Sequence, residues 1–186
     1  MRGVNFAHSE VLQVYRGLLV AAVALTACGP EPESCEEAGR VDPKLQLGTG
    51  FEDFAHIEDG DALGIDFGEQ GGWHVWMAFR TSGMVVGHGG GFGPPDPEGP
   101  TITCRLLNGE GEEVAAGEHS RFPIDGDAQQ GEVLGVQMRV SAEVNVAIDG
   151  GGDNPATGSL TLEADAVDSC GAEASSIRSV SLDLSN

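Results

Sequence analysis

Basic residues are scarce in this chain of 186 residues, which carries 9 lysines and arginines against 30 aspartates and glutamates. The formal net charge of −21 repels phosphate backbones and anionic lipid headgroups, so we expect no nucleic-acid partner. The acidic residues are spread along the chain and 40% of all residues are hydrophobic, which argues against wholesale disorder. These features predict a folded, acidic domain.

Catalytic motifs are also missing. The sequence contains no G-x-S-x-G, no H-E-x-x-H and no cysteine in a protease motif, and its many carboxylates do not single out a catalytic pair. No C-x-x-C pair is present and the histidines are scattered, so zinc and copper sites are poorly supported. We expect no catalytic activity and no cofactor except possible calcium. An enzyme with an unrecognised carboxylate site is an alternative.

The longest apolar run near the N-terminus, residues 17–25, is too short to cross a bilayer, which needs roughly 20 apolar residues. An arginine precedes this run and small residues follow it, as in an export signal. Residues 25–28, "LTAC", match the lipobox, so the N-terminus resembles that of bacterial lipoproteins. An ordinary secretory signal or a core segment is the alternative interpretation.

This resemblance implies that residues 1–27 are a signal peptide and that Cys28 is lipidated, which would anchor the chain in a lipid bilayer. Gly29 stands where aspartate retains such proteins at the inner membrane, so the resemblance implies the outer membrane, on its periplasmic face or at the cell surface. Residues 28–43 then form a tether rich in proline and glutamate, and residues 44–186 form a single domain.

Eight short runs in this domain alternate apolar and polar residues between glycines and aspartates, a pattern typical of β-strands. No segment shows a capped helical stripe, so we expect little helix. We predict an all-β fold, an antiparallel β-sandwich of immunoglobulin-like type, with a jelly roll or small barrel as alternatives. The last two strands should form a hairpin. The expected strands are residues 44–48, 62–68, 73–79, 101–107, 132–140, 144–149, 159–167 and 177–184.

The most apolar of these strands, residues 73–79, places His74 and Trp76 on one face, where they could bind a protein or glycan partner of the envelope. The alternative is a core strand with one tryptophan packed under a loop. Residues 83–100 form the longest irregular stretch and include His88 and Phe92. We predict either a recognition loop or a plain connection there.

A wider block, "EDGDALGIDFGEQGGWHVWMAFR", resembles a group of bacterial lipoproteins with an acidic DGD turn followed by QGG and H-V-W. The similarity is best over residues 45–80. It implies a shared architecture and an envelope location, and it assigns no functional residue.

Three cysteines remain beside Cys28, and an odd number outside the cytoplasm leaves one thiol without an intramolecular partner. Cys104 shares a strand face with apolar residues, whereas Cys35 lies in the tether and Cys170 in a turn. A disulfide between Cys35 and Cys170 or between Cys104 and Cys170 is possible, and spacing does not choose between them.

Acidic turns suggest an alternative function. The protein would then be an acidic structural component of the outer membrane that binds calcium. "DGDA" occurs twice and "DGGGDN" once, and such loops supply oxygen ligands in a flexible geometry. Asp-Gly is also common chemistry for a tight β-turn, which needs no ion. The candidate ligands are Asp59, Asp61, Asp125, Asp127, Asp149 and Asp153.

Overall fold

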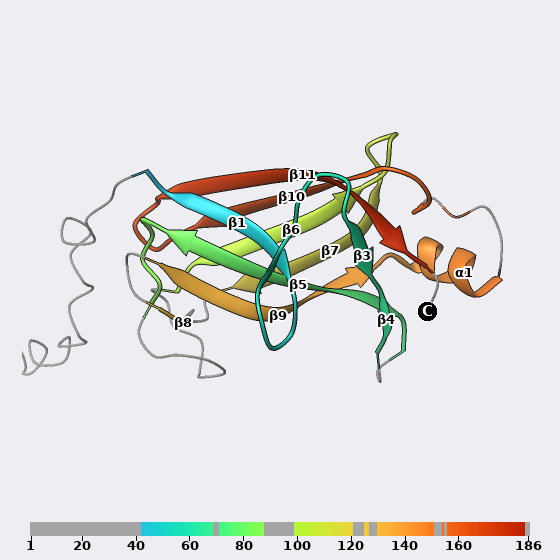
Figure 1. Ribbon diagram of the computed structural model, residues 1–186, viewed down its shortest axis with the longest axis horizontal. Helices are drawn as coiled ribbons and strands as arrows, with labels where there is room; N and C mark the ends of the chain where they lie inside the picture. Colours follow the sequence, from blue (N-terminus) through green and yellow to red (C-terminus); the bar gives the residue numbers. More distant parts are fainter. Residues whose placement is uncertain are drawn as a thin grey trace, which may run out of the picture. The chain divides into compact units, whose positions relative to one another are not determined.

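The computed structural model describes residues 42–184 except residues 69–70, 88–98, 121–124, 127–129, 151–153 and 155. Of residues 125–126 it describes the backbone alone. In this part of the chain there are eleven β-strands and one α-helix (Figure 1). In chain order they are β1 (Lys44–Thr49), β2 (Ala55–His56), β3 (Ala62–Gly64), β4 (Asp66–Phe67), β5 (Trp73–Ser82), β6 (Thr101–Leu107), β7 (Glu113–Ser120), β8 (Asp125–Gly126), β9 (Gly131–Val140), α1 (Ala142–Gly150), β10 (Leu160–Val167) and β11 (Glu173–Asp183).

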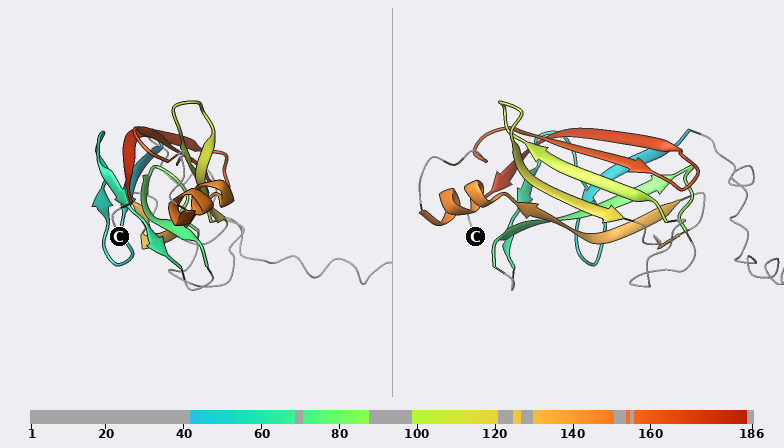
Figure 2. Two further views of the ribbon diagram at one scale, coloured as in Figure 1. Left: turned by 90° about the vertical axis from the view of Figure 1, so that its right-hand side faces the viewer. Right: turned by 180° about the vertical axis from the view of Figure 1, so that it is seen from behind.

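All the described strands belong to one sheet, in the order β2-β1-β5-β9-β7-β6-β10-β11-β3, with β4 beside β5 and β8 beside β9. Neighbouring strands run antiparallel except β3 and β11, which run parallel. The sheet curls around its own interior, so that β1 approaches β10 and β11, as the end-on view in Figure 2 shows.

The all-β prediction is therefore confirmed, and so is the final hairpin, because β10 pairs with β11 along its whole length. The two separate packed sheets of an immunoglobulin-like sandwich are not confirmed, since the described strands form one continuous, curled sheet. Periodicity specifies which face of a strand is buried but leaves the strand order open.

The core fills the inside of the curl. Alternate residues of β10 are buried, as expected for strands with one face toward the interior. The β5–β9 pairing is irregular between Met77 and Phe79, where two steps along β5 oppose three along β9, from Val136 to Val133, so the extra residue lies in β9. Met77 and Phe79 belong to the core, and Ala78, on the opposite face of β5, is buried as well. The largest fully buried side chains are Phe79, Leu47, Ile57, Leu63, Ile65, Met77, Met84, Ile102, Leu106, Met138, Leu160 and Leu162.

The strand expected over residues 144–149 was wrong, because these residues belong to the helix α1. Ser141 caps the helix: its Oγ accepts a hydrogen bond from the backbone N–H of Val144 at 3.4 Å. Val144 is buried and Ile148, one turn later, packs against the core, whereas Val146 is 71% exposed. The alternating V-N-V-A-I pattern fits a strand as well as this helix, so the cap was the informative signal.

The sequence pattern also missed β7, a central strand between β6 and β9. Its sequence, EVAAGEHS, contains only three apolar residues in a row and does not alternate. Gly117 lies where a Cβ atom would come within 2.7 Å of the Gln137 carbonyl oxygen of β9, so the two strands approach too closely there for a larger residue.

One short segment brings the two ends of the sheet together. Residues 57–65, which we call the closing segment, run from β2 at one edge to β3 at the other. On one side the Ile57 N–H donates to the Leu47 carbonyl of β1 at 3.1 Å. On the other side, the Arg178 side chain of β11 donates to the Ile57 carbonyl at 3.3 Å.

Aspartates fix the turn of the closing segment against β11. The Ser179 N–H donates to Asp59 Oδ1 at 2.8 Å, and the Gly60 N–H donates to the Ser179 carbonyl at 2.7 Å. Asp61 Oδ2 accepts from the Glu58 N–H at 2.8 Å, which closes the turn itself. Gly60 has a φ of 94°, a conformation that glycine adopts without strain.

We predict that Asp59→Ala destabilises the domain by about 1–2 kcal/mol. The Ser179 N–H then loses its acceptor, and the closing segment loses this hydrogen bond to β11. Urea unfolding of the full chain measures this loss. Asp53→Ala, which removes an exposed carboxylate from the loop before β2, is the matched control and should change the free energy of unfolding little. Equal losses in the two variants would contradict the role given to Asp59.

Candidate functional site

An exposed aromatic pair lies on the outer face of β5. Residues 50–54 fold back across this face, where the Gly135 N–H of β9 donates to the Gly50 carbonyl at 3.1 Å. The ring of Phe51 contacts Trp76 edge-to-face, with ring centroids 5.4 Å apart and an interplanar angle of 75°. Phe51 is 61% exposed, and Trp76 is partly buried beside it. We call these two residues the aromatic platform.

The platform is held in place by its surroundings. A Cβ atom on Gly135 would lie 2.9 Å from the Phe51 ring, so the ring rests on the bare backbone of β9. Phe54, at the other end of the same loop, covers Gly48. The Arg80 guanidinium lies over the Phe54 ring, 4.2 Å from its centroid. Arg80 is in turn paired with Glu132 of β9. The loop is thus fastened at both ends.

The predicted partner-binding residues do not come together in the described structure. Trp76 lies at the surface, but His74 is 2% exposed and its ring lies against Gly68, where a Cβ atom would approach it to 2.5 Å. The His74 Nδ1 atom has no hydrogen-bond partner among the described residues. His88 and Phe92 lie outside the described residues. Phe51 was missed because it falls in a loop between strands, where no periodicity marks it.

The start of the long loop belongs to the core. Met84, Val85 and Val86 are at most 8% exposed, and the Val85 N–H donates to Asp168 Oδ2 at 2.9 Å. Asp168 also accepts from the N–H groups of the β10–β11 turn and so ties that turn to this loop. Residues 84–86 therefore serve packing, as do the buried residues 99–100 at the other end of the predicted recognition loop, and residues 88–98 between them lie outside the described part of the chain.

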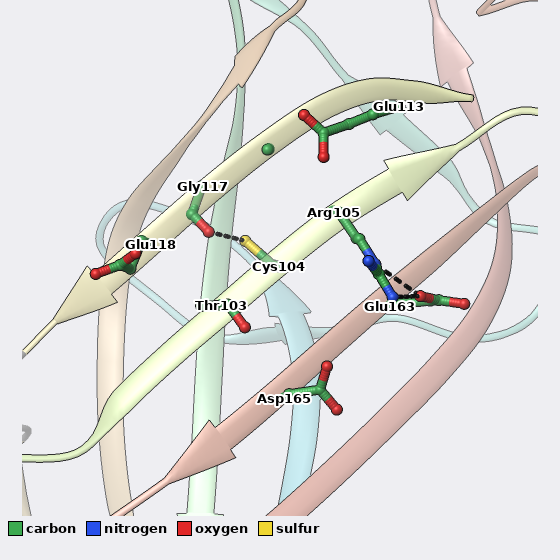
Figure 3. A pocket seen from close by; sticks show the side chains of 9 residues that line it. Thr103, Cys104, Arg105, Glu113, Gly117, Glu118, Glu163 and Asp165 are labelled. Atoms are coloured by element: carbon green, nitrogen blue, oxygen red, sulfur yellow. Dashed lines mark hydrogen bonds and ion pairs between the residues drawn. The ribbon is translucent and has the colours of Figure 1, made fainter. Parts of the chain in front are cut away.

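A shallow, open hollow of about 470 Å³ lies over β6, β7 and β10 (Figure 3). Arg105 is the single basic residue in its lining, and its Nε and Nη2 atoms both lie 2.8 Å from Glu163 Oε2. The Ser175 Oγ donates to Asp165 Oδ1 at 2.7 Å. The hollow is therefore acidic. Its lining residues are Thr103, Cys104, Arg105, Glu113, Ala116, Gly117, Glu118, Glu163 and Asp165.

Cys104 supplies no reactive thiolate to this hollow. The side chain is 3% exposed and its Sγ donates to the Gly117 carbonyl at 3.5 Å. Burial raises the pKa of the thiol from 9.0 to about 12, and the hydrogen bond to Gly117 lowers it by less. Cys104 therefore stays protonated at neutral pH, and only a thiolate would act as a nucleophile.

Cys104 is also a free cysteine, so the Cys104–Cys170 disulfide considered from the sequence is not formed. Cys170 lies in the β10–β11 turn, where its N–H donates to Asp168 Oδ1 at 2.9 Å. Cys170 is engaged in a further interaction and does not count as a free cysteine. Cys28 and Cys35 lie outside the described residues.

Three of the candidate calcium ligands have partners within the chain. Asp59 and Asp61 shape the closing segment. Asp149 Oδ1 accepts from the Trp73 indole N–H at 3.1 Å, which holds α1 against β5. These bonds give the carboxylates a role in folding that needs no ion. Asp127 and Asp153 lie outside the described residues, and the Asp125 side chain is not described.

Within the described ranges, no three histidine, cysteine or carboxylate side chains are grouped closely enough to hold a metal ion. The same part of the chain contains no helix with the length and apolarity needed to cross a membrane.

No family model matches the sequence, and no curated protein matches it. Among solved structures, the CooA pilin subunit from enterotoxigenic Escherichia coli is similar to 74% of this chain and to 99% of that chain, with 10% sequence identity and a TM-score of 0.27. Similarity at this level carries no argument about function.

We predict that the free energy of unfolding falls as the pH rises from about 9 to 12. The unfolded chain releases the Cys104 proton above its ordinary pKa of 9.0, whereas the folded chain keeps it until about 12. Stability should therefore decline by roughly 1.4 kcal/mol per pH unit inside this window. Lys44 is the single lysine and Tyr15 the single tyrosine, so few other groups titrate there.

Urea unfolding at pH 8, 9, 10 and 11 measures this slope. Cys104→Ala serves as the matched variant: it should lower stability at pH 8, because a buried side chain is lost, and flatten the alkaline decline. Parallel declines in the two proteins would assign the slope to groups other than Cys104.

Proposed function

We propose that this protein is a lipid-anchored, non-catalytic binding module of the bacterial outer envelope, which recognises a protein or glycan partner through the aromatic platform. The observation that carries the proposal is Phe51, which is 61% exposed although its ring is fixed against Trp76 and Gly135. A fixed, exposed aromatic ring offers a large apolar contact at little cost in conformational entropy. Aromatic side chains of this kind dominate binding hot spots.

The anchor in this proposal is the lipidated Cys28 of the "LTAC" sequence, with residues 28–43 as tether. β1 begins at Lys44, sixteen residues after Cys28. At about 3.3–3.6 Å per residue, an extended tether would reach roughly 50–60 Å. With the whole tether free, this reach would let the domain contact a partner well away from the outer membrane, which is the location we propose.

We also propose a disulfide between Cys35 and Cys170. Cys104 is free and buried inside the sheet, so Cys35 is the remaining candidate for Cys170 once Cys28 carries lipid. The bond would fasten the tether to the β10–β11 turn, since Cys170 lies in that turn. It would also shorten the free part of the tether to residues 28–35, about 25 Å when extended.

Serine substitutions at the four cysteines test both assignments. Cys28→Ser should abolish labelling with radioactive palmitate and release the chain into the soluble fraction, because the acyl anchor is lost. Cys35→Ser and Cys170→Ser should each increase the number of reactive thiols in unreduced, denatured protein, whereas Cys104→Ser should decrease it. Retained palmitate labelling in Cys28→Ser would overturn the anchor, and unchanged thiol counts in Cys35→Ser and Cys170→Ser would overturn the disulfide.

The aromatic platform is tested by retention of the full chain, in non-ionic detergent, on a panel of immobilised envelope glycans and envelope proteins. Phe51→Ser should weaken retention on the bound member of the panel about tenfold or more, as for a hot-spot residue. Ile177→Ser is the control, because Ile177 is 59% exposed on β11, away from the platform. Equal retention of both variants would show that the partner binds elsewhere.

A further inference from the structure

A second exposed surface lies at the end of the domain that is farthest from the start of β1. Lys44, where β1 begins, pairs with Ser82 at the last residue of β5. The first residue of β5, Trp73, is hydrogen-bonded to α1. Figure 1 shows α1 and β4 at the same end of the sheet. Because β5 has ten residues and a strand rises about 3.3 Å per residue, these two ends lie roughly 30 Å apart. We call the end with α1 and β4 the tip.

Trp73 joins three elements at the tip. Its backbone N–H donates to Asn145 Oδ1 of α1 at 2.8 Å, and its indole N–H donates to Asp149 Oδ1 at 3.1 Å. Its ring meets Phe67 of β4 at a centroid distance of 5.4 Å and an angle of 74°. Two aromatic rings and a carboxylate are therefore fixed next to one another.

The same surface leaves apolar side chains in contact with water. Phe67 is 60% exposed and Val146, on the helical turn before Asp149, is 71% exposed. Asp149 is itself exposed, and Trp73 donates to its Oδ1 atom only. The charged residues of β4 and α1 are Asp66, Glu143 and Asp149, and all are acidic.

From this arrangement we propose that the tip binds an arginine or lysine side chain in a basic segment of a protein partner. Aromatic rings attract cations through their π-faces, and a carboxylate beside them adds a direct ion pair. Val146 and Phe67 then contact the apolar residues that flank the basic side chain. This binding site is separate from the aromatic platform and does not depend on it.

Charge complementarity selects this occupant. The chain carries a net charge of −21, so it attracts basic partners over long range and repels acidic ones. An acidic peptide, a phosphorylated segment or a nucleic acid would meet three carboxylates on β4 and α1, against one exposed basic residue, Arg139, on the adjoining part of β9. A free polyamine would satisfy the carboxylate but would leave the exposed apolar side chains uncovered.

The chain has two tryptophans, Trp73 and Trp76. When Trp76 is replaced, tryptophan fluorescence therefore reports on the surroundings of Trp73 alone. The test uses the full chain with Trp76→Phe in non-ionic detergent, titrated with a peptide of alternating arginine and valine. We expect a saturable change in Trp73 fluorescence. Asp149→Asn should weaken the apparent affinity roughly tenfold, and Phe67→Ser by a similar factor.

Glu173→Gln is the matched control: it removes one charge from the β10–β11 hairpin, where Glu173 pairs with Val167, and should change the affinity less than twofold. Circular dichroism checks that α1 is intact in Asp149→Asn, and Phe67→Ser tests the site without altering the helix.

Three results would overturn the proposal. The first is unchanged Trp73 fluorescence at high peptide concentration. The second is an equal loss of affinity in Asp149→Asn and Glu173→Gln, which would indicate diffuse attraction. The third is binding of spermine as tight as that of the peptide and equally sensitive to Asp149, which would replace the protein partner with a small cation.

Discussion

The closing segment holds together the two edges of a single sheet, and the enclosed core depends on that contact. A sheet that curls without closing leaves unpaired backbone groups at both edges and opens its apolar interior to water. Residues 57–65 bond to β1 through Ile57 and to β11 through Asp59, so each edge is occupied. The same segment places Ile57, Leu63 and Ile65 in the core.

Strand β5 then carries both exposed surfaces. Its inner face supplies Val75, Met77 and Phe79 to the core, and this packing makes it rigid. Its outer face supports Trp76 and, through the loop of residues 50–54, Phe51. Its first residue, Trp73, fixes α1 and Phe67 at the tip. A binding surface on a packed central strand keeps its shape, and this reduces the entropy lost when a partner binds.

Of the five basic residues that the structure describes, Lys44 and Arg139 are exposed and the other three bond to neighbouring elements of the fold. Arg80 pairs with Glu132, Arg105 pairs with Glu163 and Arg178 bonds to the Ile57 carbonyl. Because these cations bridge neighbouring strands or bond to the closing segment, they neutralise little of the remaining surface. The excess of carboxylates is left facing water, and the acidic hollow of Figure 3 is one result. Long-range attraction of cationic partners follows from the same excess.

The sequence by itself determined the all-β class, the acidity and the final hairpin, because these follow from local periodicity and composition. It did not distinguish the helix α1 from a strand, since V-N-V-A-I satisfies both periods and only the Ser141 cap separates them. It overlooked β7, whose glycine is required by the close approach of β9.

Only the tertiary structure decided that the described strands form one curled sheet and that Asp59 and Asp149 bind parts of the chain itself. It also placed Phe51 on Trp76 and Phe67 on Trp73. These contacts join residues from separate elements, and their geometry depends on strand order and register. Neither property is encoded in the local pattern of any one segment.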